Sequence, residues 1–332
     1  MARPQPSLLS PGDRAIFDPM RSAQTTGTVL MVRPTAFHGN PQTAATNLLQ
    51  QPAALPHDEL LATAQREFDG AVAALSRAGI DVLVLEPPSG PPEGPSLPDA
   101  LFPNNWFSTH ADGTLVLYPM LAENRRLERR PDLARLLTER FGLQVARTID
   151  LSDLERAGQF VEGTGSLVLD RTEGIAYAGL SPRSTAPAIH AACEALGMEA
   201  CSFVATHASG APIYHTNVMM SVGSQVAIVC LETIRDADQR AIVIDRLQAT
   251  GKALVVIDEA QMHAFCGNVL ELASTAGPLL AVSVRAWRAF DAEQRRTLEQ
   301  HLSICPIAVD TIEQVGGGGI RCMLAEIHLP TK

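Results

Sequence analysis

A cysteine near the end of the chain, Cys322, follows four consecutive glycines and precedes an apolar segment that is typical of a strand. Glycine permits strained dihedral angles and close approach of the backbone to a ligand, so the run from Gly316 to Gly319 can bring the sulfur to a pocket. A thiolate is an intrinsically strong nucleophile. Free cysteine is also among the most buried residue types, and Cys322 taken alone is better explained as part of a core strand. A nucleophilic role therefore depends on what the rest of the chain brings to this sulfur.

A repeated order of elements runs through the chain from residue 105 onwards. Each unit is predicted to contain a strand, a glycine turn, a second strand, a helix and a third strand. The units that begin at residues 166, 217 and 268 follow at intervals of 51 residues, and the next begins at residue 322, 54 residues later. A fixed period of this size indicates a repeat architecture. The predicted elements of the complete units are strands 105–109, 114–118 and 144–148 with helix 131–141; strands 166–170, 175–179 and 199–204 with helix 185–196; strands 217–222, 225–230 and 253–257 with helix 236–249; and strands 268–273, 279–284 and 304–309 with helix 291–302.

The last unit is incomplete, because residues 322–329 supply only its first strand. The N-terminal part of the chain has the complementary elements, namely strand 28–32, amphipathic helix 58–78 and strand 81–85. We expect the two ends to pair and to close a five-bladed, pseudo-symmetric α/β propeller of ββαβ-type modules, which leaves no open sheet edge. Residues 27–330 would then form a single catalytic domain, and residues 1–26 an N-terminal arm.

A closed ring places the start of every first strand near the axis, so the five loops that precede these strands should converge. Each polar residue in these loops has an ordinary structural explanation on its own, as a solvated loop charge, a core histidine or a turn residue. Equivalent positions on a ring can instead lie within hydrogen-bond reach of one another, as catalysis requires. The candidate residues are Asp99 and Asn105 in the first loop, Glu162 in the second, His215 and Asn217 in the third, Asn268 in the fourth and Cys322 in the fifth.

Composition excludes several classes of function. The 332 residues carry a formal net charge of -10 and no basic tract, which argues against nucleic-acid binding. No apolar run approaches the roughly 20 residues of a membrane helix, and the N-terminus lacks the apolar core of a signal peptide. The six cysteines are scattered without Cys-x-x-Cys spacing, which argues for a reducing cytoplasm and against a disulfide framework or a structural zinc site. We expect a cytoplasmic protein without a membrane partner, and the sequence leaves open whether it is a monomer or a homodimer.

The motifs in the five loops resemble those of the guanidino-group-modifying superfamily, which includes arginine deiminase, dimethylargininase, the amidinotransferases and the citrulline-utilisation hydrolases. The resemblance extends from about Val29 to the end of the chain. The superfamily fold is a five-bladed α/β propeller, in agreement with the number of modules reached from the period. The resemblance implies Cys322 as the nucleophile, His215 as the acid–base residue, Glu162 as its carboxylate partner, Arg183 of Gly179-Leu180-Ser181-Pro182-Arg183 as the ligand of the substrate α-carboxylate, and Asp99 of Leu97-Pro98-Asp99 as a substrate contact.

Two positions depart from the arginine-processing relatives, which have aspartates where this chain has Asn105 and Asn217. Two carboxylates suit a cationic guanidinium, whereas amides both donate and accept and therefore suit a neutral ureido group. Hydrogen bonds to charged groups contribute roughly 1.5–3 kcal/mol each, so the loss of two charges weakens cation binding substantially. We therefore predict a cysteine-dependent hydrolase that converts citrulline to ornithine, carbon dioxide and ammonia through a covalent intermediate on Cys322, without a metal ion or an organic cofactor.

Other readings of the same residues stay open. Glu162 and Asp99 are able to pair with a guanidinium, which would make the protein an arginine deiminase or a dimethylarginine hydrolase. An amidinotransferase would use the same cysteine, histidine and carboxylate but would pass the amidino group to an amine. A non-catalytic amino-acid-binding propeller would have no need of Cys322. The two long polar loops, at 38–57 and 87–98, are both candidates for a lid.

Overall fold

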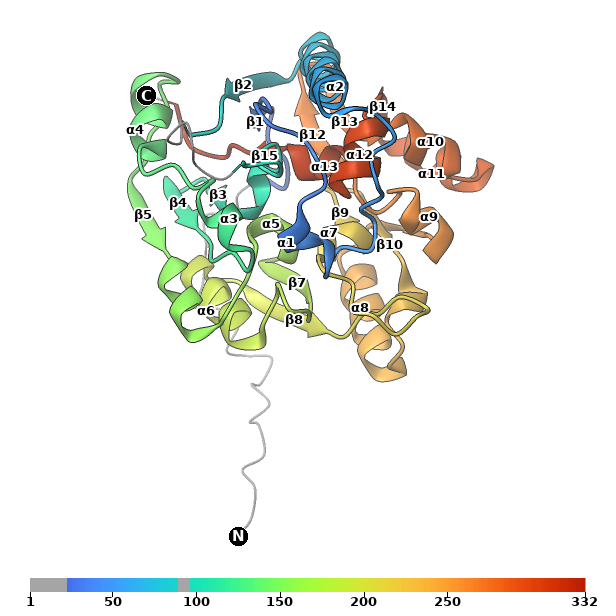
Figure 1. Ribbon diagram of the computed structural model, residues 1–332. Coiled ribbons are helices and arrows are strands. Elements are labelled where there is room, and N and C mark those ends of the chain that lie inside the picture. Colours follow the sequence, from blue (N-terminus) through green and yellow to red (C-terminus); the bar gives the residue numbers. More distant parts are fainter. Residues whose placement is uncertain (1–22, 89–95, 332) are drawn as a thin grey trace.

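The computed structural model describes residues 23–88 and 96–331, which form five three-stranded sheets around a central region with helices on the outside (Figure 1). The predicted five-bladed α/β propeller is confirmed. None of the helices in these two described ranges is long and apolar enough to cross a lipid bilayer. All six cysteines are free and buried.

Four of the sheets share one topology. The first two strands are antiparallel, and the third lies parallel to the second after a crossover helix, as a parallel connection requires. The middle strands are buried over most of their length, and Val226–Val229 is buried throughout, because helices and neighbouring modules cover both faces. The elements are β3 (Phe107–Thr109), β4 (Thr114–Leu117), α4 (Leu133–Glu139) and β5 (Arg147–Asp150); β6 (Val168–Asp170), β7 (Ile175–Gly179), α6 (Ala186–Leu196) and β8 (Glu199–Phe203); β9 (Met220–Val222), β10 (Val226–Val229), α8 (Ala237–Ala249) and β11 (Ala253–Val256); and β12 (Leu270–Ser274), β13 (Gly277–Ser283), α10 (Val284–Ala289), α11 (Ala292–His301) and β14 (Ser303–Ile307).

The fifth sheet joins the two ends of the chain. Strand β1 (Thr28–Val32) pairs in parallel with β2 (Asp81–Leu85) and antiparallel with β15 (Ala325–Glu326). Helix α2 (His57–Arg77) connects β1 to β2 and buries one apolar face, which includes Leu60, Phe68 and Leu75. The predicted closure of the ring by its N- and C-terminal segments is therefore confirmed.

The segment around Cys322 is not the continuous strand that the sequence suggests. Helix α12 (Asp310–Gly316) ends at the first glycine of the run, and Gly317 takes a left-handed conformation with φ of 66°. Cys322 then lies in a one-turn helix, α13 (Ile320–Met323), ahead of the short strand β15. Similar single turns precede the first strands of three other modules: a 3-10 turn at Pro103–Asn105, α5 (Gly163–Ser166) and α7 (Thr216–Met219). Asn105, Asn217 and Cys322 lie in these turns, and Glu162 and His215 directly precede them, so these candidates are not on the strands themselves.

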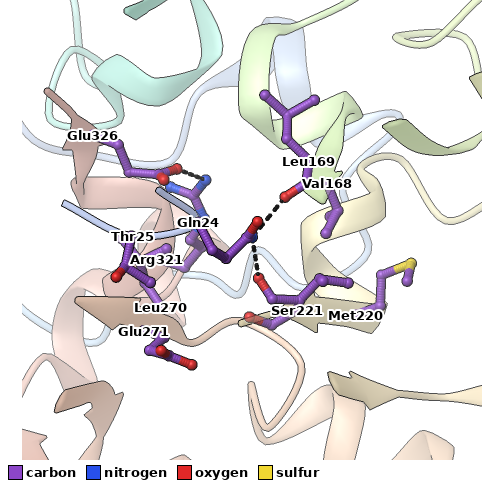
Figure 2. Close-up of a pocket in the computed structure, with 11 residues that line it drawn as sticks. Gln24, Thr25, Val168, Leu169, Met220, Ser221, Leu270, Glu271, Arg321 and Glu326 are labelled. Carbon is purple, nitrogen blue, oxygen red and sulfur yellow. Dashed lines mark hydrogen bonds and ion pairs between the residues drawn. The ribbon is translucent and has the colours of Figure 1, made fainter. Parts of the chain in front are cut away.

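The end of the predicted N-terminal arm is part of the ring. Gln24 is buried, and its amide nitrogen donates to the carbonyls of Leu169 and Val222, each at 2.9 Å (Figure 2). Its side-chain oxygen accepts from the backbone N–H of Arg171 at 2.7 Å. The side chain of Gln24 therefore links two neighbouring modules. The rest of the predicted arm up to residue 22 lies outside the described residues.

Candidate active site

The single-turn helices gather near the centre of the ring, where α5, α7 and α13 lie beside helix α1 (Pro41–Ala44) (Figure 1). They surround a small buried pocket, as the predicted convergence of the loops requires. Cys322, His215, Asp99, Asn105 and Arg183 line this pocket. The other three candidates lie behind this lining and bond to it: Glu162 to His215, and Asn217 and Asn268 to Cys322.

The sulfur of Cys322 is held by two side-chain amides. The Nδ2 atom of Asn268 lies 3.2 Å from Sγ, and that of Asn217 lies 3.6 Å from it. Asn268 also donates to the backbone carbonyl of Asn217 at 2.9 Å, which fixes both amides relative to each other. Burial raises the pKa of the Cys322 thiol, and the hydrogen bonds from the amides oppose that rise because they stabilise the thiolate. The pair therefore positions the sulfur and favours its reactive form.

A strained turn positions Asn268. Phe265, three residues earlier, has φ of 67°, and it is the one residue other than glycine with positive φ in the described parts of the chain. Its carbonyl accepts the backbone N–H of Asn268 at 2.9 Å. A left-handed conformation is unfavourable for a bulky residue and persists where the surrounding structure enforces it, often at functional sites. The strain therefore falls at the turn that aims an amide at the sulfur.

His215 and Glu162 form a buried pair. Nε2 of His215 lies 2.7 Å from one carboxylate oxygen of Glu162, and the other oxygen accepts from the backbone N–H of Leu121 at 3.0 Å. Burial alone would raise the pKa of Glu162, but the charge of Arg183 and the hydrogen bond from His215 bring it down to about 2. Burial lowers the pKa of His215 to about 4, against the opposing effect of Glu162. At neutral pH His215 is therefore neutral and donates from Nε2, which leaves Nδ1 free to accept a proton.

Two glycines of the second loop allow the imidazole to approach the first loop. A Cβ atom at Gly165 would lie 2.5 Å from Nδ2 of Asn105 and 2.8 Å from Nδ1 of His215. A Cβ at Gly163, whose φ is +48°, would lie 2.3 Å from the carbonyl oxygen of Asn104. All three contacts are shorter than a Cβ atom tolerates, so packing requires both glycines after Glu162, and backbone conformation also favours glycine at position 163.

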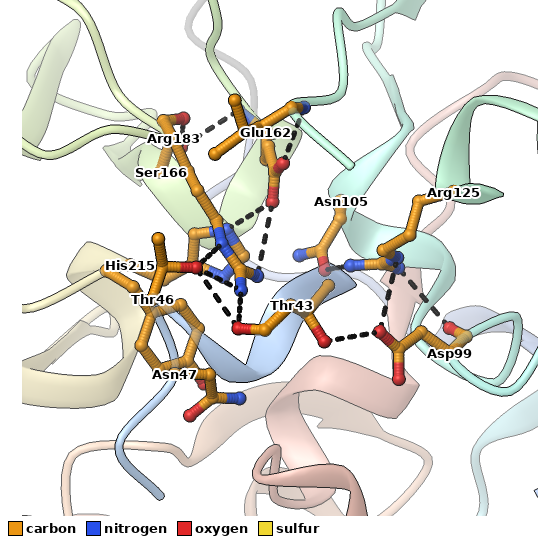
Figure 3. A network of polar contacts seen from close by, with 12 residues as sticks. Thr43, Thr46, Asn47, Asp99, Asn105, Arg125, Glu162, Ser166, Arg183 and His215 are labelled. Carbon is orange, nitrogen blue, oxygen red and sulfur yellow. Dashed lines mark hydrogen bonds and ion pairs between the residues drawn. The ribbon is translucent and has the colours of Figure 1, made fainter. Parts of the chain in front are cut away.

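Arg183 lies at the pocket, but its donors already have partners (Figure 3). Its guanidinium bonds to the side-chain oxygen of Thr46 through two nitrogens, at 2.9 and 2.6 Å, and to the carbonyl of Thr43 at 2.9 Å. It lies 3.7 Å from the carboxylate of Glu162, and its carbon lies 4.9 Å from the centre of the Tyr214 ring. The predicted ligand of the substrate carboxylate therefore also anchors the segment that contains Thr43 and Thr46.

A second buried guanidinium, that of Arg125, was missed in the sequence (Figure 3). It lies in helix turn α3 (Glu123–Arg126), within a run of charges that is typical of a solvated surface. In the structure it donates to Oδ1 of Asn105 at 2.6 Å and pairs with Glu128 at 2.9 Å. It also lies 3.9 Å from Asp99. No signal in the sequence separates this buried arginine from the partly exposed arginines that follow it.

Residues 40–51 cover the pocket. Asn40 and Thr43 donate to Oδ2 of Asp99 at 2.8 and 3.2 Å, and Asn47 donates to the carbonyl of Gly317 at 3.1 Å. Under this cover the pocket has about 10 Å³ of open space, about enough for one water molecule. Of the two loops predicted as lids, the first therefore lies over the site, whereas part of the second, residues 89–95, is outside the described residues.

Comparison with known proteins supports the superfamily that the motifs suggest. Residues 33–329 match the family model described as N,N dimethylarginine dimethylhydrolase, eukaryotic. No curated protein is similar enough in sequence to count as a match. The apo structure of ArgZ, a cyanobacterial arginine dihydrolase, has a TM-score of 0.70 at 14% identity; the match covers 92% of this chain and 41% of ArgZ. This chain therefore spans about two fifths of the length of ArgZ.

Two further structures match over their whole length. The N-terminal domain of ArgZ, a cysteine-to-serine mutant bound to substrate, has a TM-score of 0.69 at 14% identity, with coverage of 90% of this chain and 97% of that domain. The dimethylarginine dimethylhydrolase of Pseudomonas aeruginosa, a cysteine-to-serine mutant complexed with citrulline, has a TM-score of 0.62 at 13% identity. The match covers 92% of this chain and 100% of that enzyme. At these identities the structures establish the fold, and the family model, which spans most of the chain, establishes the family. Within the guanidino-group-modifying superfamily, the chain belongs to the N,N-dimethylarginine dimethylhydrolase family, a family of hydrolases that act on carbon–nitrogen bonds other than peptide bonds.

Proposed function

We propose that this chain is a cysteine-dependent hydrolase of a guanidino or ureido amino acid, and that its substrate is citrulline. The observation that carries the choice of citrulline is the pair of amides on the sulfur, from Asn217 and Asn268. A carbon attacked by Sγ of Cys322 must lie beside these amides. They can donate to a ureido oxygen and accept from its N–H groups, but they supply no negative charge to a guanidinium.

The two buried guanidinium groups at the pocket support a substrate that is an amino acid. The carboxylate of Glu162 is already bonded to His215 and to a backbone N–H, and it faces Arg183. Arg125 adds a second positive charge and contacts Asn105 directly. Two guanidinium groups suit the α-carboxylate of an amino acid, which accepts paired hydrogen bonds from arginine. Glu162 opposes the charge of Arg183, and Glu128 and Asp99 oppose that of Arg125, so the case against a cationic side chain comes from the amides beside the sulfur.

In the first half of the proposed reaction, Nδ1 of His215 takes the proton of the Cys322 thiol. The sulfur then adds to the ureido carbon and forms a tetrahedral adduct. The bond from this carbon to the terminal nitrogen breaks, His215 returns its proton to that nitrogen, and ammonia leaves. Glu162 holds the imidazole in the tautomer with the proton on Nε2 and stabilises the imidazolium while it exists. The product of this half is a thiocarbamate that joins Cys322 to the ornithine side chain.

In the second half, His215 removes a proton from water, and the resulting hydroxide adds to the thiocarbamate carbon. The carbon–sulfur bond breaks and Cys322 leaves as a thiolate. The released N-carboxylate of ornithine loses carbon dioxide, so that citrulline and one water give ornithine, carbon dioxide and ammonia. Entry of the substrate requires that residues 40–51 move, and Arg183 then exchanges Thr43 and Thr46 for the α-carboxylate.

A guanidino substrate is the second candidate, and the comparisons back it more directly than citrulline. The matching family is named for dimethylarginine, and ArgZ is an arginine dihydrolase. Within the pocket, Oδ1 of Asp99 is buried and has no hydrogen-bond partner among the described residues, so it is able to accept from a guanidinium. The same two steps would then pass through a thiouronium adduct and release citrulline.

The test is turnover of separate substrates by purified protein. Citrulline, arginine and dimethylarginine are supplied one at a time, and ornithine, citrulline, ammonia and dimethylamine are measured. Ornithine from citrulline supports the proposal. Citrulline formed from arginine or dimethylarginine, without ornithine, overturns the choice of substrate, and loss of arginine that requires an added amine acceptor overturns hydrolysis. Cys322→Ser should abolish turnover, whereas Cys305→Ser in β14 is the matched control and should retain it.

A further inference from the structure

A second cluster of polar side chains lines a cavity other than the catalytic pocket. It contains His207, in the loop after β8, with Glu259 and His263 of helix α9 (Glu259–His263). Residues four apart on a helix lie on the same face, so α9 presents its carboxylate and its imidazole side by side. His207 is buried, and the backbone hydrogen bonds from His207 to Ala211 and from Gly210 to His207 form the turn that holds it.

The three side chains point one atom each at a common centre. Nδ1 of His207 lies 3.1 Å from Nε2 of His263 and 3.4 Å from Oε1 of Glu259. The remaining separation, from Nε2 of His263 to Oε1 of Glu259, is 3.8 Å. Tetrahedral zinc with bonds of about 2.0–2.1 Å places its ligand atoms ~3.3 Å from one another. One Zn²⁺ ion in the centre of this triangle would therefore reach all three atoms with little movement.

The surroundings of Glu259 are those of a metal ligand. Both of its carboxylate oxygens accept the backbone N–H of Ala208, at 2.9 and 3.1 Å, and this N–H fixes the orientation of the carboxylate. Ligating carboxylates are commonly held by such outer contacts. Arg235 lies 3.6 Å from the second oxygen and leaves the first facing the two imidazoles. A hydrogen bond from one imidazole to the other would satisfy their two nitrogens and would leave Oε1 of Glu259 with the backbone N–H of Ala208 as its partner.

A cavity of about 380 Å³ adjoins the cluster. All three side chains line it, so three protein ligands would leave the fourth tetrahedral position open to this space. Leu48 and Gln51, from the end of the segment that covers the catalytic pocket, form another part of the wall, together with Phe265. The cluster therefore lies between the covering segment and the strained turn that aims Asn268 at the sulfur.

We propose that His207, Glu259 and His263 bind one Zn²⁺ ion at a site separate from the catalytic pocket. Two imidazoles and one carboxylate form a ligand set that suits zinc. The absence of Cys-x-x-Cys spacing argues against a cysteine-based structural zinc site, but this set uses no cysteine. The proposal does not depend on the identity of the substrate.

Equilibrium dialysis of tag-free protein against ZnCl₂ tests the site. The unmodified chain should bind one Zn²⁺ per molecule at this site. His263→Gln should weaken that binding by more than about tenfold, because even residues that only support a ligand contribute 10- to 100-fold in affinity. His263 has a side chain that is 47% exposed, so this variant should fold. His190→Gln, at an exposed position of α6, is the matched control and should bind as the unmodified chain does.

Two results would overturn the proposal. One is binding by His263→Gln that equals binding by the unmodified chain. The other is loss of the bound ion in Cys322→Ser with full binding in His190→Gln, because that outcome places the zinc on the catalytic thiol. Co²⁺ provides an independent readout, since a tetrahedral site of nitrogen and oxygen ligands gives visible absorption bands without a thiolate charge-transfer band. These bands should be present in Cys322→Ser and absent in His263→Gln.

Discussion

Replacement of Asn217 by aspartate places a carboxylate beside the nucleophile at almost unchanged volume. The sulfur of Cys322 lies 3.6 Å from Nδ2 and 4.0 Å from Oδ1 of Asn217. Two unit charges 4 Å apart interact by about 4 kcal/mol at an effective dielectric constant of ~20. A guanidinium carbon under attack by this sulfur carries its charge at a similar distance, whereas a ureido carbon carries none. Asn217→Asp should therefore shift the preference between arginine and citrulline by up to ~10³-fold towards arginine.

The assay is the ratio of kcat/KM for arginine to kcat/KM for citrulline. The new carboxylate also raises the pKa of the Cys322 thiol and slows both reactions, but this effect cancels in the ratio because the free enzyme is common to both. Asn217→Ser is the control, since it removes the same amide without adding a charge. It should slow the reactions of both substrates with little change in the ratio of their kcat/KM values. A ratio within about threefold of the original in Asn217→Asp would refute the charge argument, as would an equally large shift in Asn217→Ser.

Three further substitutions test other parts of the account. Glu162→Gln should lower kcat by about 10²–10⁴-fold, because His215 loses the carboxylate that fixes its tautomer and stabilises its charged form; turnover close to that of the unmodified chain would contradict this role. Glu313→Gln should flatten the pH dependence of stability. Burial raises the pKa of Glu313 to about 8 from an ordinary value of 4.5, so the folded state holds a proton that the unfolded state loses, and the free energy of unfolding should fall by a few kcal/mol as pH rises from about 4.5 to 8. Urea unfolding across this pH range should show that the free energy of unfolding falls less steeply in Glu313→Gln than in the unmodified chain. Equal slopes of this free energy against pH would contradict the role given to Glu313. Thr46→Val should release Arg183 from the covering segment and accelerate amide hydrogen exchange in residues 40–51 by about 10- to 100-fold, whereas unchanged exchange would show that this contact does not hold the cover.

The arrangement of the fold followed from the spacing of apolar runs and glycines. Strands β1 and β2 begin and end where the sequence predicts, and β7 coincides with the predicted 175–179. A 51-residue period places the loops of the different modules at equivalent positions, and ring closure turns that equivalence into proximity. This is why side chains as distant in sequence as Glu162, His215 and Cys322 could be expected around one pocket from the sequence alone.

The details that set the chemistry were harder to predict. Asn105, Asn217 and Cys322 lie in single helical turns, which are too short to show an apolar period, so these segments look like strands. Arg125 is buried by contacts with Asn105 and with a carboxylate three residues later, and no local pattern marks that burial. Tertiary contacts of this kind are set by the closed ring and not by neighbouring residues.

The same limit applies to segments that have no repeat partner. Residues 40–51 have no counterpart in the other modules, so the period could not place them over the pocket. Their position depends on hydrogen bonds from Asn40 to Asp99 and from Arg183 to Thr46, which span 59 and 137 residues. The cluster of His207, Glu259 and His263 likewise joins a loop to a helix in a different module.

The central claim is that the carbon of the substrate becomes bonded to Cys322 during turnover. Rapid acid quenching during the reaction, followed by peptide mass analysis, tests it most directly. The account predicts an adduct on the peptide that contains Cys322, with the mass of the substrate less the departing amine, and no such adduct in a parallel sample of Cys322→Ser. An adduct on any other residue, or undiminished turnover by Cys322→Ser in that sample, would contradict the account.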